Sequence, residues 1–342
     1  MAHAVARFVL GMIACLAALE LLFRVLPVST TTLTGYHFDP EILSYPANHE
    51  WRVATGWDLR NPQTLRSNNA GFVSERDFVR NPSAIALIGD SYIESSMLRA
   101  GDRPAAQLER ALDGRRPVNA MGSPGSSLLD YAERIRFAQE QFGTRDFIVL
   151  MERGDVRQSL CGSGNIHSRC IDPQTLTPRT EKLAPPSLAK RALRHSALAQ
   201  YLFSQLKVEP TRFLAQLFSA PSAPAGKPAS DARALQQVDA IAAAFFQRAG
   251  PHVAGRLIIV IDGDRRGLPA GGIAHDPARE RFMVLARTAG ALVIDAEPIY
   301  RRHFSRSKLS LDVGPYDGHL NRLGVGLLAQ TMAAALQGDA AQ

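Results

Sequence analysis

The sequence predicts an α/β protein in which helices cover both faces of a mostly parallel sheet. Five short apolar runs have the length and composition of buried strands, and segments with helical periodicity separate them. The runs are continuously apolar, as expected for strands buried on both faces. Strand–helix alternation of this kind is typical of a three-layer α/β/α arrangement. The expected strands are residues 84–88, 117–121, 147–151, 257–261 and 291–294.

The N-terminal segment predicts a membrane anchor. Residues 8–26 are almost wholly apolar and are long enough to cross a bilayer once. Glu20 is costly in lipid but lies near the far end, where it can reach the interface. No small-residue cleavage site precedes Pro27, so we expect an uncleaved signal anchor. With Arg7 on the cytoplasmic side, the chain should be a single-pass inner-membrane protein whose body lies in the periplasm. A buried helix is the alternative interpretation.

We expect the chain to divide into an anchor, an extension and a body. The anchor comprises residues 1–28. Residues 29–80 form a turn-rich extension whose aromatic residues predict packing on the body. Residues 81–342 form the body, which a helical insertion at about residues 157–250 interrupts. Helices are expected at residues 105–112, 128–141, 279–289 and 323–336, and within the insertion near 187–206 and 232–249.

The charge of the chain argues against a nucleic-acid partner. Its 39 Lys and Arg residues and 32 Asp and Glu residues give a formal net charge of +7. The excess is scattered, without a dense basic block or interleaved aromatic residues. We therefore expect a solvated basic surface and no nucleic acid.

Cysteine usage agrees with export from the cytoplasm. Cys161 and Cys170 bound a short polar stretch, and in an oxidising compartment such a pair is most simply a disulfide. A metal pair is the weaker interpretation, because only His167 lies between them and no second ligand pair follows. We expect no metal and no cofactor.

The candidate nucleophile follows the first expected strand. Gly89, Asp90 and Ser91 end the first apolar run, and open α/β sheets gather reactive groups at the carboxyl ends of their strands. Gly89 allows a tight turn, and Ser91 lies at or near a helix N-terminus with its backbone N–H free. A serine in this position can attack a carbonyl and donate its own N–H to the oxyanion. An ordinary polar turn is the competing interpretation.

A second polar turn supplies possible partners for this serine. Asp317 and His319 precede the last expected helix and should lie at the same edge of the sheet as Ser91. A nucleophilic hydroxyl needs a base within hydrogen-bond reach and a carboxylate that orients the base. We therefore take Ser91, His319 and Asp317 as the candidate catalytic residues.

The triplets at residues 89–91 and 317–319 resemble the motifs of the SGNH (GDSL-type) hydrolase family. The resemblance runs from about residue 67 to residue 336, and residues 68–72 are similar to the preface of membrane-anchored bacterial members found with surface polysaccharide systems. It implies a flavodoxin-like three-layer fold with five strands and Ser91 as the nucleophile. It also implies an oxyanion hole formed by the N–H groups of Ser91 and of a glycine after the second strand. Gly125 is the better match for that glycine, and Gly122 is the other possibility.

Two positions depart from the family pattern. The third motif usually supplies an Asn side chain to the oxyanion hole, but Gly154 stands there. Either another donor substitutes, with Asn165 and Arg153 as candidates, or activity is reduced or the reaction differs. The family's Asp usually lies three residues before its His, whereas Asp317 lies two before; Asp312 is a distant alternative.

The resemblance implies a serine esterase that removes acyl groups, most simply acetyl groups, from a cell-surface or extracellular polysaccharide. Asp90, Arg153 and Gly154 should line the substrate site. A polysaccharide O-acyltransferase that uses the same residues is one alternative. A catalytically degenerate domain that binds glycan or serves as an assembly subunit is another. The expected partners are the acylated glycan, the bacterial inner membrane and polysaccharide-assembly proteins.

Overall fold

The structure, a computed structural model, describes residues 2–35, 37–38, 42–163, 169–181, 187–206, 231–271, 275–314 and 317–338. The chain divides into two compact units. The first comprises Met1–Gly35, Glu50–Leu65 and Ala184–Lys227, and the second comprises Tyr36–His49, Arg66–Leu183 and Pro228–Gln342.

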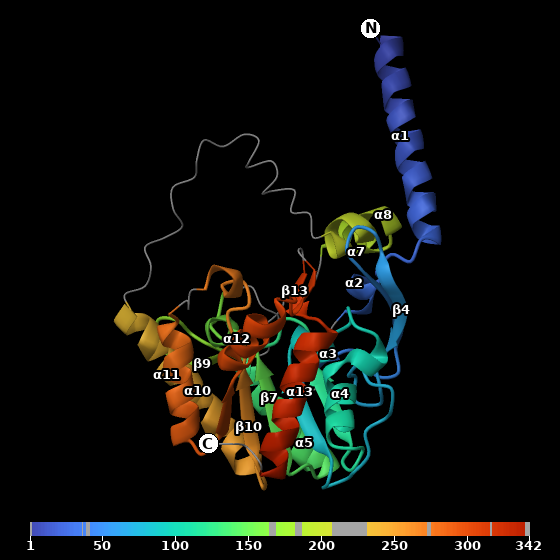
Figure 1. Ribbon diagram of the computed structural model, residues 1–342. Helices are drawn as coiled ribbons and strands as arrows, with labels where there is room; N and C mark the ends of the chain where they lie inside the picture. Colours follow the sequence, from blue (N-terminus) through green and yellow to red (C-terminus); the bar gives the residue numbers. More distant parts are fainter. Residues whose placement is uncertain are drawn as a thin grey trace. The chain divides into compact units, whose positions relative to one another are not determined.

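The second unit is built on a five-stranded sheet in which all neighbouring strands are parallel. The strand order is β6-β5-β7-β10-β11, the flavodoxin-like order in which the second strand lies outside the first. Figure 1 labels two neighbouring strands of this sheet, β7 and β10. Every strand begins and ends within one residue of its predicted range. The strands are β5 (Ile85–Gly89), β6 (Val118–Gly122), β7 (Asp146–Met151), β10 (Leu257–Ile261) and β11 (Leu292–Asp295).

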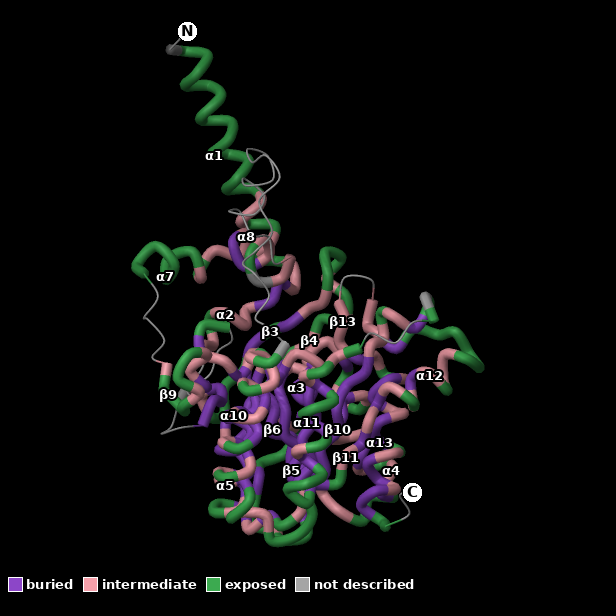
Figure 2. The backbone as a smooth tube through the Cα atoms, turned by 90° about the vertical axis from the view of Figure 1, so that its left-hand side faces the viewer, coloured by how far each residue is buried: buried purple, intermediate pink, exposed green. Residues whose placement is uncertain are grey.

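Helices cover both faces of this sheet, because successive strand residues point to opposite sides. Ala86 and Ile88 of β5 pack in one buried cluster with side chains of α5 (Leu128–Phe142), α10 (Asp231–Ala249) and α11 (Pro277–Thr288). Ile85 and Leu87 pack in the other cluster with α4 (Pro104–Ala111), α12 (Ala296–Ser307) and α13 (Arg322–Gln337). Figure 2 shows the sheet strands as the buried centre of the unit. The predicted three-layer fold is confirmed.

Several elements differ from the sequence predictions. Helix α10, which we placed at the end of the insertion, packs within the layer of α5 and α11. Helix α12 was not expected. The polar turn before the last helix is an antiparallel pair of β12 (Asp312–Gly314) and β13 (Asp317–Leu320). The smaller elements of this unit are β1 (His37–Phe38), β2 (Leu43–Ser44), α3 (Ser91–Glu94), α6 (Asp155–Gln158), β8 (Arg169–Ile171) and β9 (Pro178–Thr180).

The first unit contains the expected N-terminal helix. Helix α1 (Ala2–Val25) is long and apolar enough to cross a membrane over His3–Val25. The unit also holds α2 (Thr31–Thr34) and the hairpin of β3 (Glu50–Thr55) and β4 (Arg60–Arg66). The predicted helical stretch near residues 187–206 is divided into α7 (Leu188–Arg194), α8 (Ala197–Ala199) and the π-helix η2 (Gln200–Gln205). The predicted boundaries of anchor, extension and body remain a prediction.

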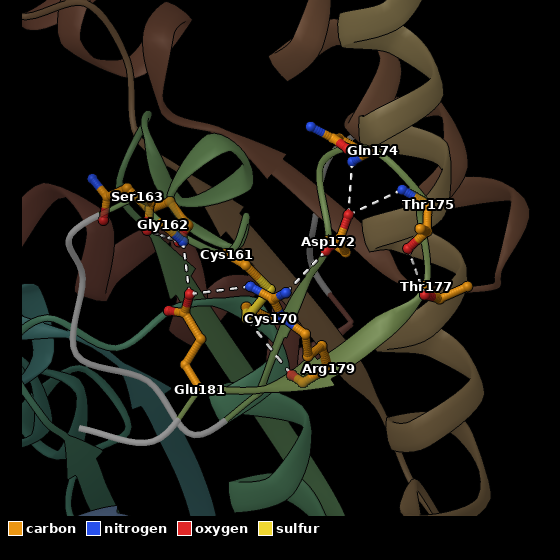
Figure 3. Close-up of a disulfide and its surroundings, with 11 residues drawn as sticks. Cys161, Gly162, Ser163, Cys170, Asp172, Gln174, Thr175, Thr177, Arg179 and Glu181 are labelled. Carbon is orange, nitrogen blue, oxygen red and sulfur yellow. Dashed lines mark hydrogen bonds and ion pairs between the residues drawn. A yellow bond between two sulfur atoms is a disulfide. The ribbon is translucent and has the colours of Figure 1, made fainter. Parts of the chain in front are cut away.

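The predicted disulfide joins Cys161 to Cys170 (Figure 3). Both cysteines are buried, and Cys170 lies on β8, which pairs with β9. Glu181 lies close enough to the sulfur atoms to complete a set of metal ligands in principle. A disulfide offers no thiolate to a metal, so the bridge has a structural role here. His167, together with Asn165, lies outside the described residues.

Candidate active site

Three of the predicted residues meet beyond the carboxyl ends of the strands. Ser91 begins α3 directly after β5, and His319 lies on β13 just before α13. The Nε2 atom of His319 lies 2.8 Å from Ser91 Oγ, and its Nδ1 atom lies 2.6 Å from Asp317 Oδ1. Hydroxyl, imidazole and carboxylate therefore form the hydrogen-bonded chain that a Ser-His-Asp triad requires.

The strand β13 explains how an Asp two residues before the His can orient it. Residues i and i+2 of a strand point to the same side, so Asp317 and His319 lie on one face of β13. The Asp317 carboxylate also accepts a hydrogen bond of 3.0 Å from the backbone N–H of His319. The rival carboxylate, Asp312, accepts instead from Nε of Arg265 at 2.6 Å. The structure thus brings Asp317, and not Asp312, to the imidazole.

A buried arginine holds β13 in this position. The Arg265 guanidinium donates to the carbonyl of Gly318 and, over 2.9 Å, to the hydroxyl of Tyr92, which itself donates to the same carbonyl at 3.1 Å. Arg265 also forms an ion pair with Asp262. Burial alone would lower the pKa of Arg265, but the Asp262 carboxylate raises that pKa above its ordinary value. The guanidinium is therefore a permanent cation beneath the histidine. Arg265 was not predicted as a site residue, because nothing local in the sequence marks it.

Asp90 shapes the turn that presents the serine. Its Oδ1 atom accepts a hydrogen bond of 2.8 Å from the N–H of Tyr92, which caps α3. Its second oxygen lies 3.4 Å from Ser91 Oγ. Burial raises the pKa of Asp90. Asp90 lines the cleft, but its side chain bonds to the backbone of the turn that carries Ser91, so its role is to stabilise that turn.

Two backbone N–H groups at the cleft are candidates for an oxyanion hole. Within the described part of the chain, the N–H groups of Ser91 and Gly125 donate to no protein acceptor. Both residues line one cleft together with His319. Gly125 has a φ of +78°, a left-handed conformation that favours glycine. A side chain at the alternative, Gly122, would collide with the backbone of Glu94, so Gly122 serves the packing of β6 against α3. The geometry favours Gly125 as the second donor.

A glutamate and a glutamine share the space beside Gly154, where the family has an Asn side chain. Gly154 lies in the turn between β7 and α6, and a Cβ atom built there would lie 2.7 Å from Oε2 of Glu152 and 2.9 Å from Nε2 of Gln158. Gln158 lines the cleft with Ser91, whereas Gly154 is not among the lining residues that the structure describes. The Gln158 amide donates a hydrogen bond of 3.3 Å to Glu152 Oε2, and this bond holds the amide beside Gly154. Gln158 was not predicted as a site residue; the signal that could have found it is an amide one helical turn after Gly154.

The donors proposed from the sequence are placed differently. Arg153 lines the cleft but pairs with Asp276 at 3.2 Å and with Asp264 at 3.4 Å. Its guanidinium is thus committed to carboxylates. Asn165 lies outside the described residues. Gln158, which lines the cleft and donates to Glu152, is the side chain that we take as the candidate third donor.

The cleft around the serine is strongly polar. Its volume is about 520 Å³, and no aliphatic side chain lines it among the described residues. Burial raises the pKa of Glu152, so this carboxyl carries less charge than an exposed glutamate at mildly acidic pH. The lining residues are Asp90, Ser91, Tyr92, Gly125, Glu152, Arg153, Gln158, Asp262, Gly263, Asp264, Arg265, Arg266, Asp312, Gly318 and His319.

Comparisons with known proteins find similarity among solved structures. No protein-family model and no curated protein matches the chain. A catalytic mutant of an acetylxylan esterase from Geobacillus stearothermophilus is 12% identical, with a TM-score of 0.41; the match covers 77% of this chain and 97% of that one. A carbohydrate acetylesterase from Sinorhizobium meliloti is also 12% identical, with a TM-score of 0.36 and coverage of 75% and 99%.

A member of the lipolytic G-D-S-L family from Veillonella parvula is a further similar structure. It is 12% identical, with a TM-score of 0.38, and the match covers 74% of this chain and 96% of that one. The similar structures therefore include esterases and a member of the family that residues 89–91 and 317–319 resemble.

Proposed function

We propose that the chain is an SGNH (GDSL-type) serine esterase that removes short acyl groups, most simply acetyl groups, from a polysaccharide outside the cytoplasm. The observation that carries this proposal is the hydrogen-bonded chain of Ser91, His319 and Asp317, with distances of 2.8 and 2.6 Å. A catalytically degenerate domain would not require these three side chains to be hydrogen-bonded to one another beside the N–H group of Ser91.

The reaction follows from the positions of these groups. His319 Nε2 takes the proton of Ser91 Oγ as that oxygen attacks the acyl carbonyl carbon. Asp317 keeps the proton of Nδ1 in place and stabilises the imidazolium. The N–H groups of Ser91 and Gly125, with the amide of Gln158, stabilise the oxyanion. Collapse of this intermediate breaks the ester bond, and the leaving glycan oxygen takes the proton from His319 and becomes a hydroxyl group.

Water completes the cycle. With the glycan released, His319 is neutral again and can take a proton from a water molecule, whose oxygen attacks the acyl-serine carbonyl. The second tetrahedral intermediate uses the same donors. Its collapse releases the carboxylic acid and returns the proton to Ser91.

The lining of the cleft supports a short acyl group on a polar alcohol. A long alkyl chain would find no aliphatic partner there, and burying it against charged groups would gain little of the about 0.8 kcal/mol that each buried CH₂ contributes in an apolar pocket. Sugar hydroxyl groups, in contrast, find many hydrogen-bond partners in this cleft. The substrate class that fits is an acetylated carbohydrate.

Helix α1 supports a location at a membrane. It is apolar enough to span, and the disulfide fits an oxidising compartment. Both features are consistent with a bacterial inner-membrane protein whose site faces the periplasm. Polysaccharide-assembly proteins are the partners that such a location would offer.

The test measures acetate release by the full chain in detergent. Acetylated xylan and 4-nitrophenyl acetate should be hydrolysed, and the octanoate ester should react at least tenfold more slowly. Ser91→Ala should abolish turnover, whereas Ser305→Ala, on an exposed part of α12, should not. Equal rates for the wild type and Ser91→Ala would refute the proposal.

A labelled acyl donor with an added glycan acceptor separates the two enzyme alternatives. Label that appears in acetate supports the esterase. Label that accumulates in the glycan, in a manner that depends on Ser91, would instead establish an O-acyltransferase.

A further inference from the structure

A carboxylate on the anchor helix holds α8 in place. Glu20 accepts hydrogen bonds from Ser196 Oγ at 2.7 Å and from the N–H groups of Ala197 and Leu198 at 2.9 and 3.0 Å. It also pairs with Arg24 at 2.8 Å. These hydrogen bonds fix α8 beside α1. They also pair the Glu20 carboxylate, which would be costly near lipid without partners. The contact lies about 7–8 Å before the end of α1, at the level of the lipid headgroups if α1 spans the membrane.

One aromatic contact and two hydrogen bonds link the tip of the β3–β4 hairpin to the same end of α1. The ring of Tyr201 stacks on Phe23 of α1 with 4.3 Å between centroids. The Tyr201 hydroxyl donates to the carbonyl of Trp57 at 2.7 Å, and the Gln205 amide donates to the carbonyl of Gly56 at 2.7 Å. The side chain of Trp57 itself is 67% exposed. An exposed tryptophan beside the end of a spanning helix has the position of an interfacial anchor.

Helix α7 has an apolar side and a cationic side. At about 100° per residue, Leu188 and Leu193 fall on one side with two alanines, and Lys190, Arg191 and Arg194 fall on the other. The two leucines are 75% and 52% exposed. None of the three cations pairs with a carboxylate among the described residues. Cations next to exposed leucines are typical of a helix that lies on an anionic membrane surface.

A groove connects these cations to η2. It has a volume of about 360 Å³ and is lined by Leu193 and Phe203 next to Lys190 and Arg194. Apolar walls with cations beside them match an anionic phospholipid, whose phosphate meets the cations while its chains meet the apolar side chains.

We propose that the hairpin tip at residues 56–59 together with α7, α8 and η2 forms an interfacial collar that binds anionic phospholipids of the bilayer that α1 crosses. This proposal rests on the insertion of α1 in a membrane, and it does not depend on the esterase activity. The collar is held to α1 by Glu20 and Tyr201, and Trp57 and α7 contact the lipid. Continuity with the anchor is what favours a lipid surface over a protein partner for these exposed side chains.

The first experiment tests the depth of Trp57. The full chain is reconstituted into phosphatidylcholine vesicles with and without lipid brominated in the acyl chains. The chain has two tryptophans, and the other, Trp51, is buried in the protein. The wild type should therefore show a quenched component that Trp57→Phe lacks. This exposed substitution should leave acetyl-ester hydrolysis unchanged.

The second experiment tests the lipid charge. Amide hydrogen exchange in α7 should slow about fivefold or more when phosphatidylglycerol is added to phosphatidylcholine vesicles. The triple variant Lys190→Gln, Arg191→Gln, Arg194→Gln should lose this effect. A matched triple variant on exposed cations of the other unit, at residues 302, 306 and 308, should retain it.

The failures are distinguishable. A chain that does not float with vesicles overturns both anchor and collar, whereas the esterase proposal stands. A chain that floats but shows no quenching of Trp57 overturns the collar alone. Exchange in α7 that ignores phosphatidylglycerol overturns the anionic lipid as the partner.

Discussion

Replacing Asp317 by Asn should lower kcat by about 10²–10³-fold and leave KM nearly unchanged. The amide can no longer hold the Nδ1 proton, so the wrong imidazole tautomer faces Ser91. In a fully buried serine-protease triad the same change costs about 10⁴-fold. Here the side chains of His319 and Asp317 are 22% and 26% exposed, so water partly replaces the lost acceptor. The expected loss corresponds to roughly 3–4 kcal/mol of transition-state stabilisation.

Initial rates of acetyl-ester hydrolysis measure this loss, and Asp312→Asn is the matched control. Asp312 accepts from Arg265, which keeps its ion pair with Asp262 when Asp312 is replaced. We expect a loss of less than about tenfold for the control. If the control lost as much as Asp317→Asn, or if Asp317→Asn lost less than threefold, the assignment of the orienting carboxylate would be wrong.

Three further predictions concern other parts of the molecule. Gln158→Ala should lower kcat about 10²-fold without changing Tm, and a kcat within threefold of the wild type would exclude this amide from the oxyanion hole. Burial raises the pKa of Glu94 from 4.5 to about 7, so the folded state holds a proton that the unfolded state releases. This stabilisation is complete below pH 4.5 and is lost as pH rises through 7. Over that window the free energy of unfolding, measured in denaturant titrations, should therefore fall by roughly 3 kcal/mol more in the wild type than in Glu94→Gln. Replacing Cys161 and Cys170 by Ala should cost about 2–3 kcal/mol of stability in the same titrations, and an unchanged midpoint would contradict a stabilising bridge.

The sheet was predictable because its strands are buried on both faces. Such strands are continuously apolar, so their ranges could be read from local sequence to within one residue. The N-terminal helix was predictable because its apolar run is long. Ser91 could be found because its polar motif follows a buried strand, and His319 because its polar motif precedes the last helix.

The parts of the site that could not be predicted from the sequence depend on contacts between residues far apart in the chain. The short segment Asp317–Leu320 has no strand pattern, and it pairs with β12 while Arg265 and Tyr92 hold its backbone. The two-residue spacing of Asp317 and His319 becomes intelligible only once β13 is known to be a strand. Helix α6 has four residues and too little periodicity to place Gln158.

The packing of α10 was not predictable for a related reason. Its amphipathic pattern indicated a helix but did not show which surface the helix covers. Phe245 and Ile241 of α10 lie in the same buried cluster as Ile88 of β5. The destination of an amphipathic helix depends on tertiary structure, which a local pattern does not carry.

The central claim, that Ser91 is an activated nucleophile, is tested most directly by a fluorophosphonate probe and mass spectrometry. The full chain should acquire a single adduct, located on the peptide that contains Ser91. The adduct should be absent in Ser91→Ala and should form more slowly in Asp317→Asn. A wild-type chain that stays unlabelled, or a Ser91→Ala chain that is labelled at the wild-type rate, would contradict the claim.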